Sequence, residues 1–530
     1  MIHYQLLIFI TLLFVVVILT MLSNKLRVSY PILLVVAGLI VSLLPGVPEV
    51  RMEPDWVFFV FLPPLLYAAA WNTSWHDFWF YKRPIALLAF GLVIFTATAV
   101  AYVSTALIPG FTLAAGFLLG GIISPPDAVA ATSVLQSAKL PKRVITILEG
   151  ESLVNDASSL IVFRFALASI LTGEFVLRKA AGDFFLVSIM GILIGLAVAH
   201  VVYLVHRFLP TSSSIDTALT LITPYFMYIA AEHFHCSGVL AVVSGGLFLS
   251  FRAHEILTYE SRIQSKYVWE TLQFLLNGIV FILIGMQLPE VEAGLERSSL
   301  GQALWYGIVI SALIIAIRII WVFPAAYLPR RFSSRIRARE ERPAPQAVFL
   351  IGWSGMRGLV SIASALAIPL TLPGGEAFPN RHMILFITFV VIVVTLVLQG
   401  LSLPYVIRRL KIEVQDNHSL QEQQVRLRLA NAVVAFLETE FRVQTTENEV
   451  FARVKERYER MIEHTARKLA EDDPELSAPA FLADYRKMLL SVVRVRREEI
   501  LRMRSEKAFP EELLREKEHE LDLEEARLHR

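Results

Sequence analysis

Two acidic motifs lie inside a strongly apolar part of the chain. The first is Ser124-Pro125-Pro126-Asp127, and the second runs from Glu149 to Asp156 with the sequence Glu-Gly-Glu-Ser-Leu-Val-Asn-Asp. An ionisable side chain at membrane depth costs about 2.5–3.5 kcal/mol even on the scale derived from insertion experiments. Carboxylates at membrane depth therefore indicate a functional site that binds a charged species.

The spacing of the second motif places its polar groups along one side of a helix. Residues three or four apart share a helix face, so Glu149, Ser152 and Asp156 present carboxylate, hydroxyl and carboxylate in one row. Glu151 and Asn155 form a second pair on the adjoining face. The two motifs supply only oxygen ligands, which suit hard cations and disfavour zinc or copper. Facing carboxylates fit a monovalent cation or protons better than a neutral solute.

The composition divides the chain into two regions that prefer different solvents. Of its 530 residues, 55% are hydrophobic and 18% are charged, and the mean hydropathy is +0.58. Residues 411–530 nevertheless hold 22 of the 49 Lys and Arg residues and 26 of the 47 Asp and Glu residues. This pattern predicts a membrane body over 1–410 and a water-soluble tail over 411–530. The single Cys236 excludes a disulfide framework within one chain.

Thirteen apolar runs are long enough, or nearly long enough, to cross a bilayer, which takes about 20 residues. They are residues 4–22, 30–46, 55–71, 84–108, 112–137, 144–171, 182–208, 214–233, 237–252, 268–288, 300–328, 346–370 and 382–408. The first run has no basic region before it, and Lys25 and Arg27 follow it. We therefore expect a retained first span and not a removed signal peptide.

The basic residues between these runs predict the orientation in the membrane, because cytoplasmic loops carry an excess of Lys and Arg. With the N-terminus outside, 20 basic residues near the span ends fall on the inner side. Five then fall on the outer side, namely Arg51, Arg178, Lys179, Arg297 and Arg381. This distribution predicts a multi-pass protein of the plasma (inner) membrane whose N-terminus lies outside and whose tail is cytoplasmic.

Two of the predicted spans contain residues that interrupt helices. The fifth contains Pro125-Pro126, and the twelfth contains Gly352, Gly355 and Gly358 at every third position. Such breaks are tolerated at membrane depth where the backbone lines a cavity or is buried in protein. The breaks lie seven spans apart, so the two copies would have opposite orientation. The fold predicted is an all-α membrane protein with inverted repeats, two discontinuous crossing helices and a helical cytoplasmic tail.

Arg357 lies beside the second break and needs an acidic partner, because a guanidinium stays charged at any accessible pH. Glu151 and Glu149 are the acids available, and we expect Glu151 to form a structural ion pair with Arg357. Arg164 and Arg318 are further arginines within predicted spans, and the sequence alone does not predict which residues they contact. Glu232, His233 and His235 fall in a predicted outer loop, where solvated surface is favoured over metal binding.

Four segments together resemble a known family. They are Phe-Leu-Pro-Pro-Leu-Leu (61–66), Ser-Pro-Pro-Asp-Ala-Val (124–129), Gly-Glu-Ser-Leu-Val-Asn-Asp (150–156) and Gly-Met-Arg-Gly (355–358). They resemble the sodium/proton exchanger branch of the monovalent cation:proton antiporters, particularly its bacterial members, and the likeness covers about 5–410. It implies a homodimer in which a core part (about 84–171 and 300–410) moves like an elevator against a dimerisation part. The dimerisation part would be about 1–83 and 209–290, with a linker helix at about 182–208.

The resemblance also implies residue roles. Asp156 would be the essential carboxylate that binds cation and proton, Asn155 would replace the second aspartate of electrogenic relatives, and Glu151 would pair with Arg357. Asp127, Ser152, Asn155 and Pro126 would complete the cation site. Two departures concern ion preference: the segment Tyr67-Ala68-Ala69-Ala70 lacks an acid that relatives often carry, and Pro126 replaces a hydroxyl or non-proline residue.

The function expected is exchange of Na⁺ or Li⁺ for H⁺ in pH and sodium homeostasis. With Asp156 as the single titrating carboxylate, exchange would be electroneutral and one for one, and Glu149 is the residue that could carry a second proton. The alternatives are a K⁺/H⁺ antiporter, and more remotely a cation channel or an ion-sensing receptor. No nucleotide, zinc or nucleophile motif occurs, so we expect no enzyme activity, cofactor, nucleic-acid partner or metal beyond the transported cation. The tail could be solvated or could make a regulatory contact.

Overall fold

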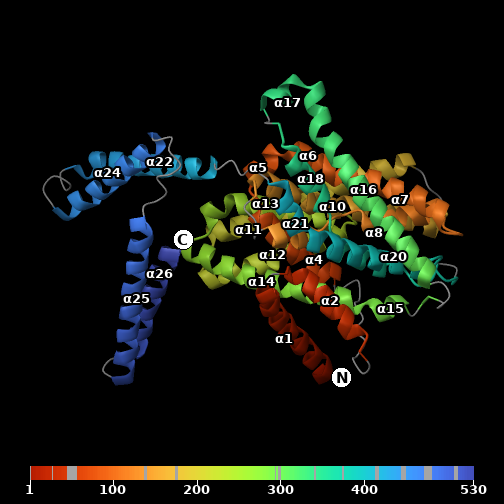
Figure 1. Ribbon diagram of the computed structural model, residues 1–530, viewed down its shortest axis with the longest axis horizontal. Coiled ribbons are helices and arrows are strands. Elements are labelled where there is room, and N and C mark those ends of the chain that lie inside the picture. Colours follow the sequence, from red (N-terminus) through yellow and green to blue (C-terminus); the bar gives the residue numbers. More distant parts are fainter. Residues whose placement is uncertain are drawn as a thin grey trace. The chain divides into compact units, whose positions relative to one another are not determined.

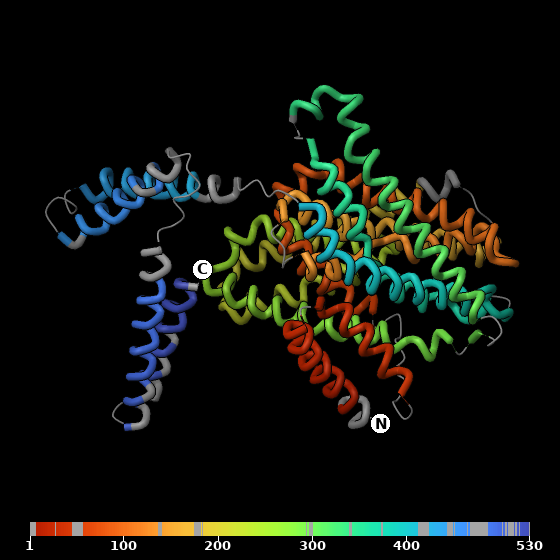
Figure 2. Tube along the Cα trace, in the orientation of Figure 1, coloured from red at the N-terminus to blue at the C-terminus, as the bar shows by residue number. Residues whose placement is uncertain are grey.

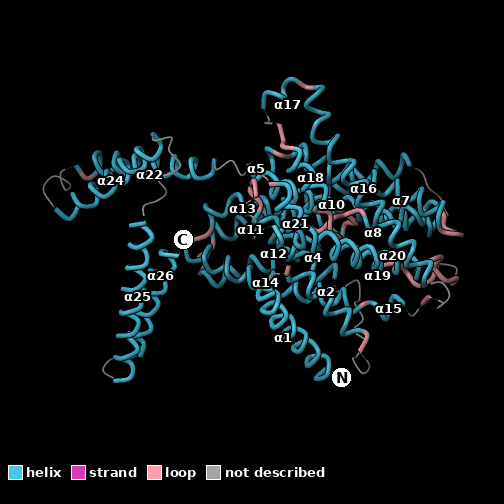
Figure 3. The backbone as a smooth tube through the Cα atoms, viewed as in Figure 1, coloured by secondary structure: helices cyan, strands magenta, loops and turns pink. Residues whose placement is uncertain are grey.

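The computed structural model describes residues 2–26, 28–44, 57–135, 140–173, 177–292, 294–295, 300–339, 342–372, 375–411, 417–442, 449–470, 480–506 and 511–529. The chain forms two units, Met1–Val414 and Gln415–Arg530, and each is described here by itself. The described residues are helical apart from connecting loops and one isolated bridge between Thr371 and Ala377 (Figure 3). Arg51 and Arg297, which entered the predicted orientation, lie outside the described residues.

The first unit is a bundle of helices, most of which are labelled in Figure 1. Its longer helices are α1 (Ile2–Leu26), α2 (Tyr30–Ser42), α4 (Leu62–Asn72), α7 (Val93–Leu107), α8 (Leu113–Ile123), α9 (Ala128–Leu135), α10 (Lys142–Thr172), α11 (Leu177–Phe208), α12 (Ser213–His233), α13 (Gly238–Ile256), α14 (Tyr259–Met286), α16 (Leu300–Phe332), α18 (Pro345–Trp353), α19 (Leu359–Leu366), α20 (Arg381–Val394) and α21 (Gly400–Leu410). Short helices and π-helical turns connect them, namely η1 (Val57–Phe61), α5 (Trp75–Phe80), α6 (Lys82–Ala86), η2 (Leu87–Leu92), α15 (Leu288–Glu292), α17 (Ser334–Arg339) and η3 (Thr395–Gln399).

Nine helical stretches among the described residues are long and apolar enough to cross a membrane. Two shorter apolar stretches, Tyr30–Ser42 and Val57–Asn72, accompany them. The predicted all-helical, multi-pass architecture is therefore confirmed. The count of thirteen spans and the inverted repeat stay predictions.

Both predicted helix breaks interrupt a helix in the structure. The first separates α8 from α9, which is consistent with the missing backbone donors of Pro125 and Pro126. The second separates α18 from α19 over Ser354–Gly358. Each break leaves the backbone groups at two helix ends without intrahelical partners, so those groups are available for contacts with other elements.

The apolar side chains of the first unit form two buried clusters. The larger cluster contains buried residues of α7, α8, α10, α16, α18, α19, α20 and α21. It also includes buried residues of α2 and α14. The second cluster joins α4, α11, α12 and α13 to one face of α10, through Leu153, Ala157 and Leu160. Helix α10 therefore contributes to both clusters, and it also carries the second acidic motif.

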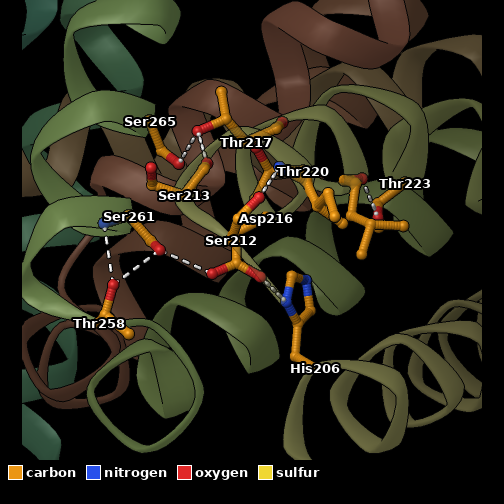
Figure 4. A network of polar contacts seen from close by, with 12 residues as sticks. His206, Ser212, Ser213, Asp216, Thr217, Thr220, Thr223, Thr258, Ser261 and Ser265 are labelled. Atoms are coloured by element: carbon orange, nitrogen blue, oxygen red, sulfur yellow. Dashed lines mark hydrogen bonds and ion pairs between the residues drawn. The ribbon is translucent and has the colours of Figure 1, made fainter. Parts of the chain in front are cut away.

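A buried polar network ties α11, α12 and α14 to one another (Figure 4). Nδ1 of His206 lies 2.9 Å from a carboxylate oxygen of Asp216, and the Ser261 hydroxyl donates to the other oxygen at 2.6 Å. One turn further, the hydroxyls of Thr217 and Ser265 lie 3.0 Å apart. These buried groups satisfy one another across the helices, so they hold α12 and α14 in one register.

The second unit consists of two helical hairpins (Figure 2). In the first, α22 (Asn417–Glu440) packs against α24 (Glu449–Ala470), and Lys455 lies 2.8 Å from Glu438. In the second, α25 (Ala480–Glu506) packs against α26 (Glu511–His529), and Arg496 lies 2.6 Å from Glu524. Exposed ion pairs of this kind contribute about 0–1 kcal/mol each. The predicted helical tail is thus present.

Candidate functional site

The two helix breaks contact each other directly. The backbone N–H of Asp127, at the first break, donates to the carbonyl oxygen of Met356, at the second, over 2.7 Å. In return, Nε of Arg357 donates to the carbonyl oxygen of Ile123, the last residue of α8, over 3.0 Å. Backbone groups that the breaks leave without helical partners are therefore satisfied across the contact, as buried polar groups must be.

Asp127 sits at the centre of this contact. One of its carboxylate oxygens accepts the N–H of Val129 at 2.8 Å, so the side chain caps the start of α9. The other oxygen faces Gly358, where an added Cβ would come within 2.2 Å of it. A side chain at position 358 would therefore displace the carboxylate, which explains why glycine suits the end of the second break.

Helix α10 is anchored to the first break by its polar face. The Ser152 hydroxyl oxygen accepts the N–H of Ala128 at 3.3 Å, and Nδ2 of Asn155 donates to the carbonyl oxygen of Pro126 at 3.1 Å. Asn155 is fully buried, and its side-chain oxygen has no hydrogen-bond partner among the described residues. The amide of Asn155 therefore fixes the broken backbone beside the carboxylates while remaining uncharged.

A cavity of about 550 Å³ opens beside these groups. The residues predicted for the site that line it are Pro126, Asp127, Glu149, Ser152 and Asp156. None of the described residues donates a hydrogen bond to the Asp156 carboxylate, so its oxygens are available to a cation, a proton or water. Carboxylate and hydroxyl oxygens that line a cavity suit a hard cation.

Helix α14 supplies a polar wall of the cavity that our sequence analysis missed. Glu270, Gln273 and Asn277 line the cavity, as do Phe274 and Phe281 of the same helix. Their spacing of three and four residues within an apolar run puts them on one helix face. That pattern was the available signal, and it is weaker than a motif because surface helices share it.

The predicted partner of Glu151 is wrong. The Glu151 carboxylate is held by both terminal nitrogens of Arg318, a residue of α16, at 2.5 and 2.8 Å. Nε of Arg318 also donates to the carbonyl oxygen of Ile351 at 3.2 Å, and both charged side chains are 1% exposed. Arg357 instead donates to the backbone carbonyls of Ile123 and Gly355. The planar fork of an arginine favours this two-point geometry with a carboxylate.

Gly355 makes room for both arginines. A Cβ at this position would lie 2.4 Å from Cδ of Arg318 and 3.1 Å from a terminal nitrogen of Arg357. Both guanidinium-bearing side chains therefore lie close to Gly355, and Arg318 engages the Glu151 carboxylate. Sequence spacing could not reveal this contact, because Arg318 and Glu151 lie 167 positions apart.

Arg164, the other arginine without an assigned partner, pairs with Glu232 of α12. One terminal nitrogen of Arg164 lies 2.9 Å from each oxygen of the Glu232 carboxylate. In the part of the chain that the structure describes, no group of three or more His, Cys, Asp or Glu side chains could hold a metal ion.

These features define a class of protein. A multi-pass helical protein in which interrupted helices meet beside a carboxylate-lined cavity has the construction of a secondary ion transporter. Comparison with known families gives the particular family: "Sodium/hydrogen exchanger, transmembrane" matches residues 10–409. The chain belongs to the sodium/hydrogen exchanger family, whose members are cation/proton antiporters and not enzymes.

Curated relatives agree with this assignment. An uncharacterized Na(+)/H(+) exchanger of Mycobacterium tuberculosis (strain ATCC 25618 / H37Rv) is 32% identical over 534 residues, covering 99% of this chain and 96% of the relative. A protein of Bacillus pumilus (strain SAFR-032) named sodium, potassium, lithium and rubidium/H(+) antiporter is 33% identical, covering 71% of this chain and 57% of the relative.

A solved structure has the same fold. The sodium proton antiporter MjNhaP1 from Methanocaldococcus jannaschii superimposes with a TM-score of 0.61 at 16% sequence identity. The match covers 78% of this chain and 100% of that chain. At this identity the likeness speaks for the fold, and the arrangement of the first unit is therefore shared with an antiporter.

Proposed function

We propose that this protein exchanges Na⁺ for H⁺, with Li⁺ as a second substrate, and that Asp156 carries both ions in turn. The observation that carries the proposal is the cavity lined by Asp156, Asp127 and Ser152, in which none of the described residues donates a hydrogen bond to the Asp156 carboxylate. Pro126 shapes the backbone at this point, and Asn155 holds its carbonyl in place. A cation and a proton compete for the same negative charge on Asp156, so binding one expels the other.

The stoichiometry proposed is one cation for one proton. A single titrating carboxylate has the same charge whether it is loaded with a proton or with a monovalent cation, so the exchange step is electroneutral. Asn155 supports this reading because its amide cannot titrate. Glu149 also lines the cavity and is the residue able to add a second proton. Imposing a membrane potential separates the two cases, because one net elementary charge feels about 2.3 kcal/mol per 100 mV.

The conformation described here is proposed to face the cytoplasm. The cavity is lined by Tyr30 at the start of α2, Asn72 at the end of α4, and Glu149 and Glu270 in the first halves of α10 and α14. These helix ends adjoin the loops rich in Lys and Arg, which belong on the inner side. The N-terminus is then outside, and residues 411–530 are cytoplasmic and free to make a regulatory contact.

Alternating access is proposed to follow an elevator motion within a homodimer. The parts that would move are 84–171 and 300–410, and the parts that would stay are 1–83 and 209–290, with the helix at 182–208 as linker. The buried network between α11, α12 and α14 supports a rigid stationary part. The crossing helices would carry the site as one body, because the backbone N–H of Asp127 and the side chain of Arg357 each donate a hydrogen bond from one break to the other.

K⁺/H⁺ exchange is the second candidate. The wall of the cavity formed by α4 consists of Leu62, Leu65, Leu66 and Ala69 up to Asn72 and offers no carboxylate. One cation ligand fewer weakens discrimination by size and charge, and one relative bears a name that includes potassium and rubidium. Selectivity between Na⁺ and K⁺ is therefore part of the test.

The test is ion exchange by the purified protein in liposomes. Vesicles with an acidic lumen that contains a pH-sensitive dye receive Na⁺, Li⁺ or K⁺ on the outside, and the rate at which the lumen becomes more alkaline is measured for each cation. We expect dissipation with Na⁺ and Li⁺ that a permeant counter-ion does not accelerate. Dissipation that depends on a shunting ion would indicate net charge movement, either through a channel or by exchange with a second proton on Glu149. No dissipation with any alkali cation would refute exchange.

A further inference from the structure

The face of α10 that carries the cation site continues beyond it. Ser152, Asp156, Leu160 and Arg164 follow one another at steps of four residues, so they lie in one row on the helix. At a rise of about 1.5 Å per residue, Arg164 lies about 12 Å along the helix from Asp156. It lies on the other side of Asp156 from Glu149, which lines the 550 Å³ cavity.

An apolar layer separates Arg164 from the cation site. Leu160 belongs to the buried cluster that also contains Leu62 and Leu66 of α4 and Leu153 and Ala157 of α10. Beyond this layer lies a separate cavity of about 140 Å³. Its lining includes Leu160, Phe163, Arg164, Tyr228 and Glu232. The same row of α10 thus meets a large cavity on one side of Leu160 and a small one on the other.

The ion pair at this small cavity bridges two helices. The Arg164 side chain, from α10, reaches both oxygens of Glu232, from α12, at 2.9 Å. One of these oxygens also accepts the N–H of Gly238 at the start of α13, over 3.3 Å. The side chains are 46% and 23% exposed, and ion pairs with that much access to water are weakly held. A weak pair can break and re-form during each transport cycle.

We propose that Arg164 and Glu232 form the outer gate of this exchanger, with the Leu160 layer as the seal beneath it. The inference rests on the proposed alternating access, in which α10 moves with the core part and α12 stays with the dimerisation part. In the conformation described here the pair closes the side opposite the open cavity. It has to separate before Asp156 can face the outside.

A static anchor is the rival explanation, and cross-linking distinguishes the two. In a Cys236→Ser background, Arg164→Cys and Glu232→Cys are joined by a short cleavable bis-thiosulfonate reagent. We expect exchange in liposomes to fall at least tenfold on cross-linking and to recover when the linker is cleaved. The matched control joins Thr217→Cys to Ser265→Cys, whose hydroxyls lie 3.0 Å apart between α12 and α14 within the stationary part. Cross-linking that pair should leave exchange unchanged.

A second measurement needs no transport. Thr132 lines the large cavity, so a cysteine placed there reports how long the cavity stays open. Neutralising the pair with Arg164→Gln and Glu232→Gln should slow labelling of Thr132→Cys by an impermeant maleimide at least twofold, because the inward-facing state loses a contact. The exchanged pair Arg164→Glu with Glu232→Arg should restore the rate.

Two results would overturn the gate: full exchange by the Arg164–Glu232 cross-linked protein, or unchanged labelling after neutralisation. A protein that never exchanges ions in its unmodified form refutes the proposed function instead. The labelling result remains readable in that case, so the two failures are distinguishable.

Discussion

The buried ion pair between Glu151 and Arg318 allows a quantitative test of how the second helix break is held. Three variants form a cycle: Glu151→Gln, Arg318→Gln and the double substitution. Removing one member of a buried pair leaves the other charge uncompensated, at a cost of about 3–5 kcal/mol. In the double variant no charge is stranded by the change, and the two amides can bond to each other.

The surroundings predict that the two single variants differ. Glu151→Gln leaves Arg318 and Arg357 as two cations flanking Gly355 without the carboxylate, so its cost should fall near the upper end of that range. Arg318→Gln leaves Glu151 with Arg357 still nearby as a compensating cation, so its cost should fall near the lower end. The coupling energy of the cycle should be about 2–3 kcal/mol, which is typical of residues in one network.

Thermal stability in detergent measures these differences. With an unfolding entropy of about 2.1 cal/mol/K per residue over a membrane unit of some 400 residues, a loss of about 3–5 kcal/mol lowers the apparent Tm by about 4–6 °C. Unfolding of such a protein is irreversible, so all variants must be compared at one heating rate. The double variant should melt above Glu151→Gln.

The control cycle pairs Glu151→Gln with Arg357→Gln. Strictly additive losses for Glu151 and Arg318, or a larger coupling between Glu151 and Arg357, would refute the assignment of the pair. The first result would mean that the two charges do not stabilise each other. The second would mean that Arg357 is the ion-pair partner of Glu151, as the sequence had led us to expect.

Three further predictions concern transport. Asp156→Asn should abolish exchange, since the amide has the same size as the carboxylate but cannot titrate. The variant should keep the elution volume of the unmodified protein, and its Tm should change by only a few degrees. Robust exchange by this variant would remove Asp156 from the mechanism. Gly358→Ala should raise the cation KM at least tenfold, because its Cβ would come within 2.2 Å of the Asp127 carboxylate. The control Gly182→Ala should not change KM, since nothing lies within 4 Å of its added Cβ. Equal KM values for both variants would contradict the proposed place of Asp127. Lowering the pH should raise the apparent cation KM without lowering the maximal rate, and a pH gradient that tracks an imposed membrane potential would refute one-for-one exchange.

Local features of the sequence were sufficient to predict the membrane-spanning helices, one helix break and the candidate site. Apolar runs of about 20 residues predict helices that cross a bilayer, and Pro125-Pro126 predicts where one of them breaks, because proline lacks the backbone donor. The row of Glu149, Ser152 and Asp156 follows from the helical repeat alone. The cost of burying a carboxylate makes this row a candidate site before any fold is known.

Tertiary structure decided which of these groups meet. Glu151 pairs with Arg318 and not with Arg357, Asp127 fits against Gly358, and Glu270, Gln273 and Asn277 close the cavity from α14. Helical periodicity relates residues within about one turn, whereas these contacts join helices far apart in sequence. Which residues contact each other depends on how the helices pack and on which glycine leaves space between them. Neither can be read from the spacing of the residues along the chain.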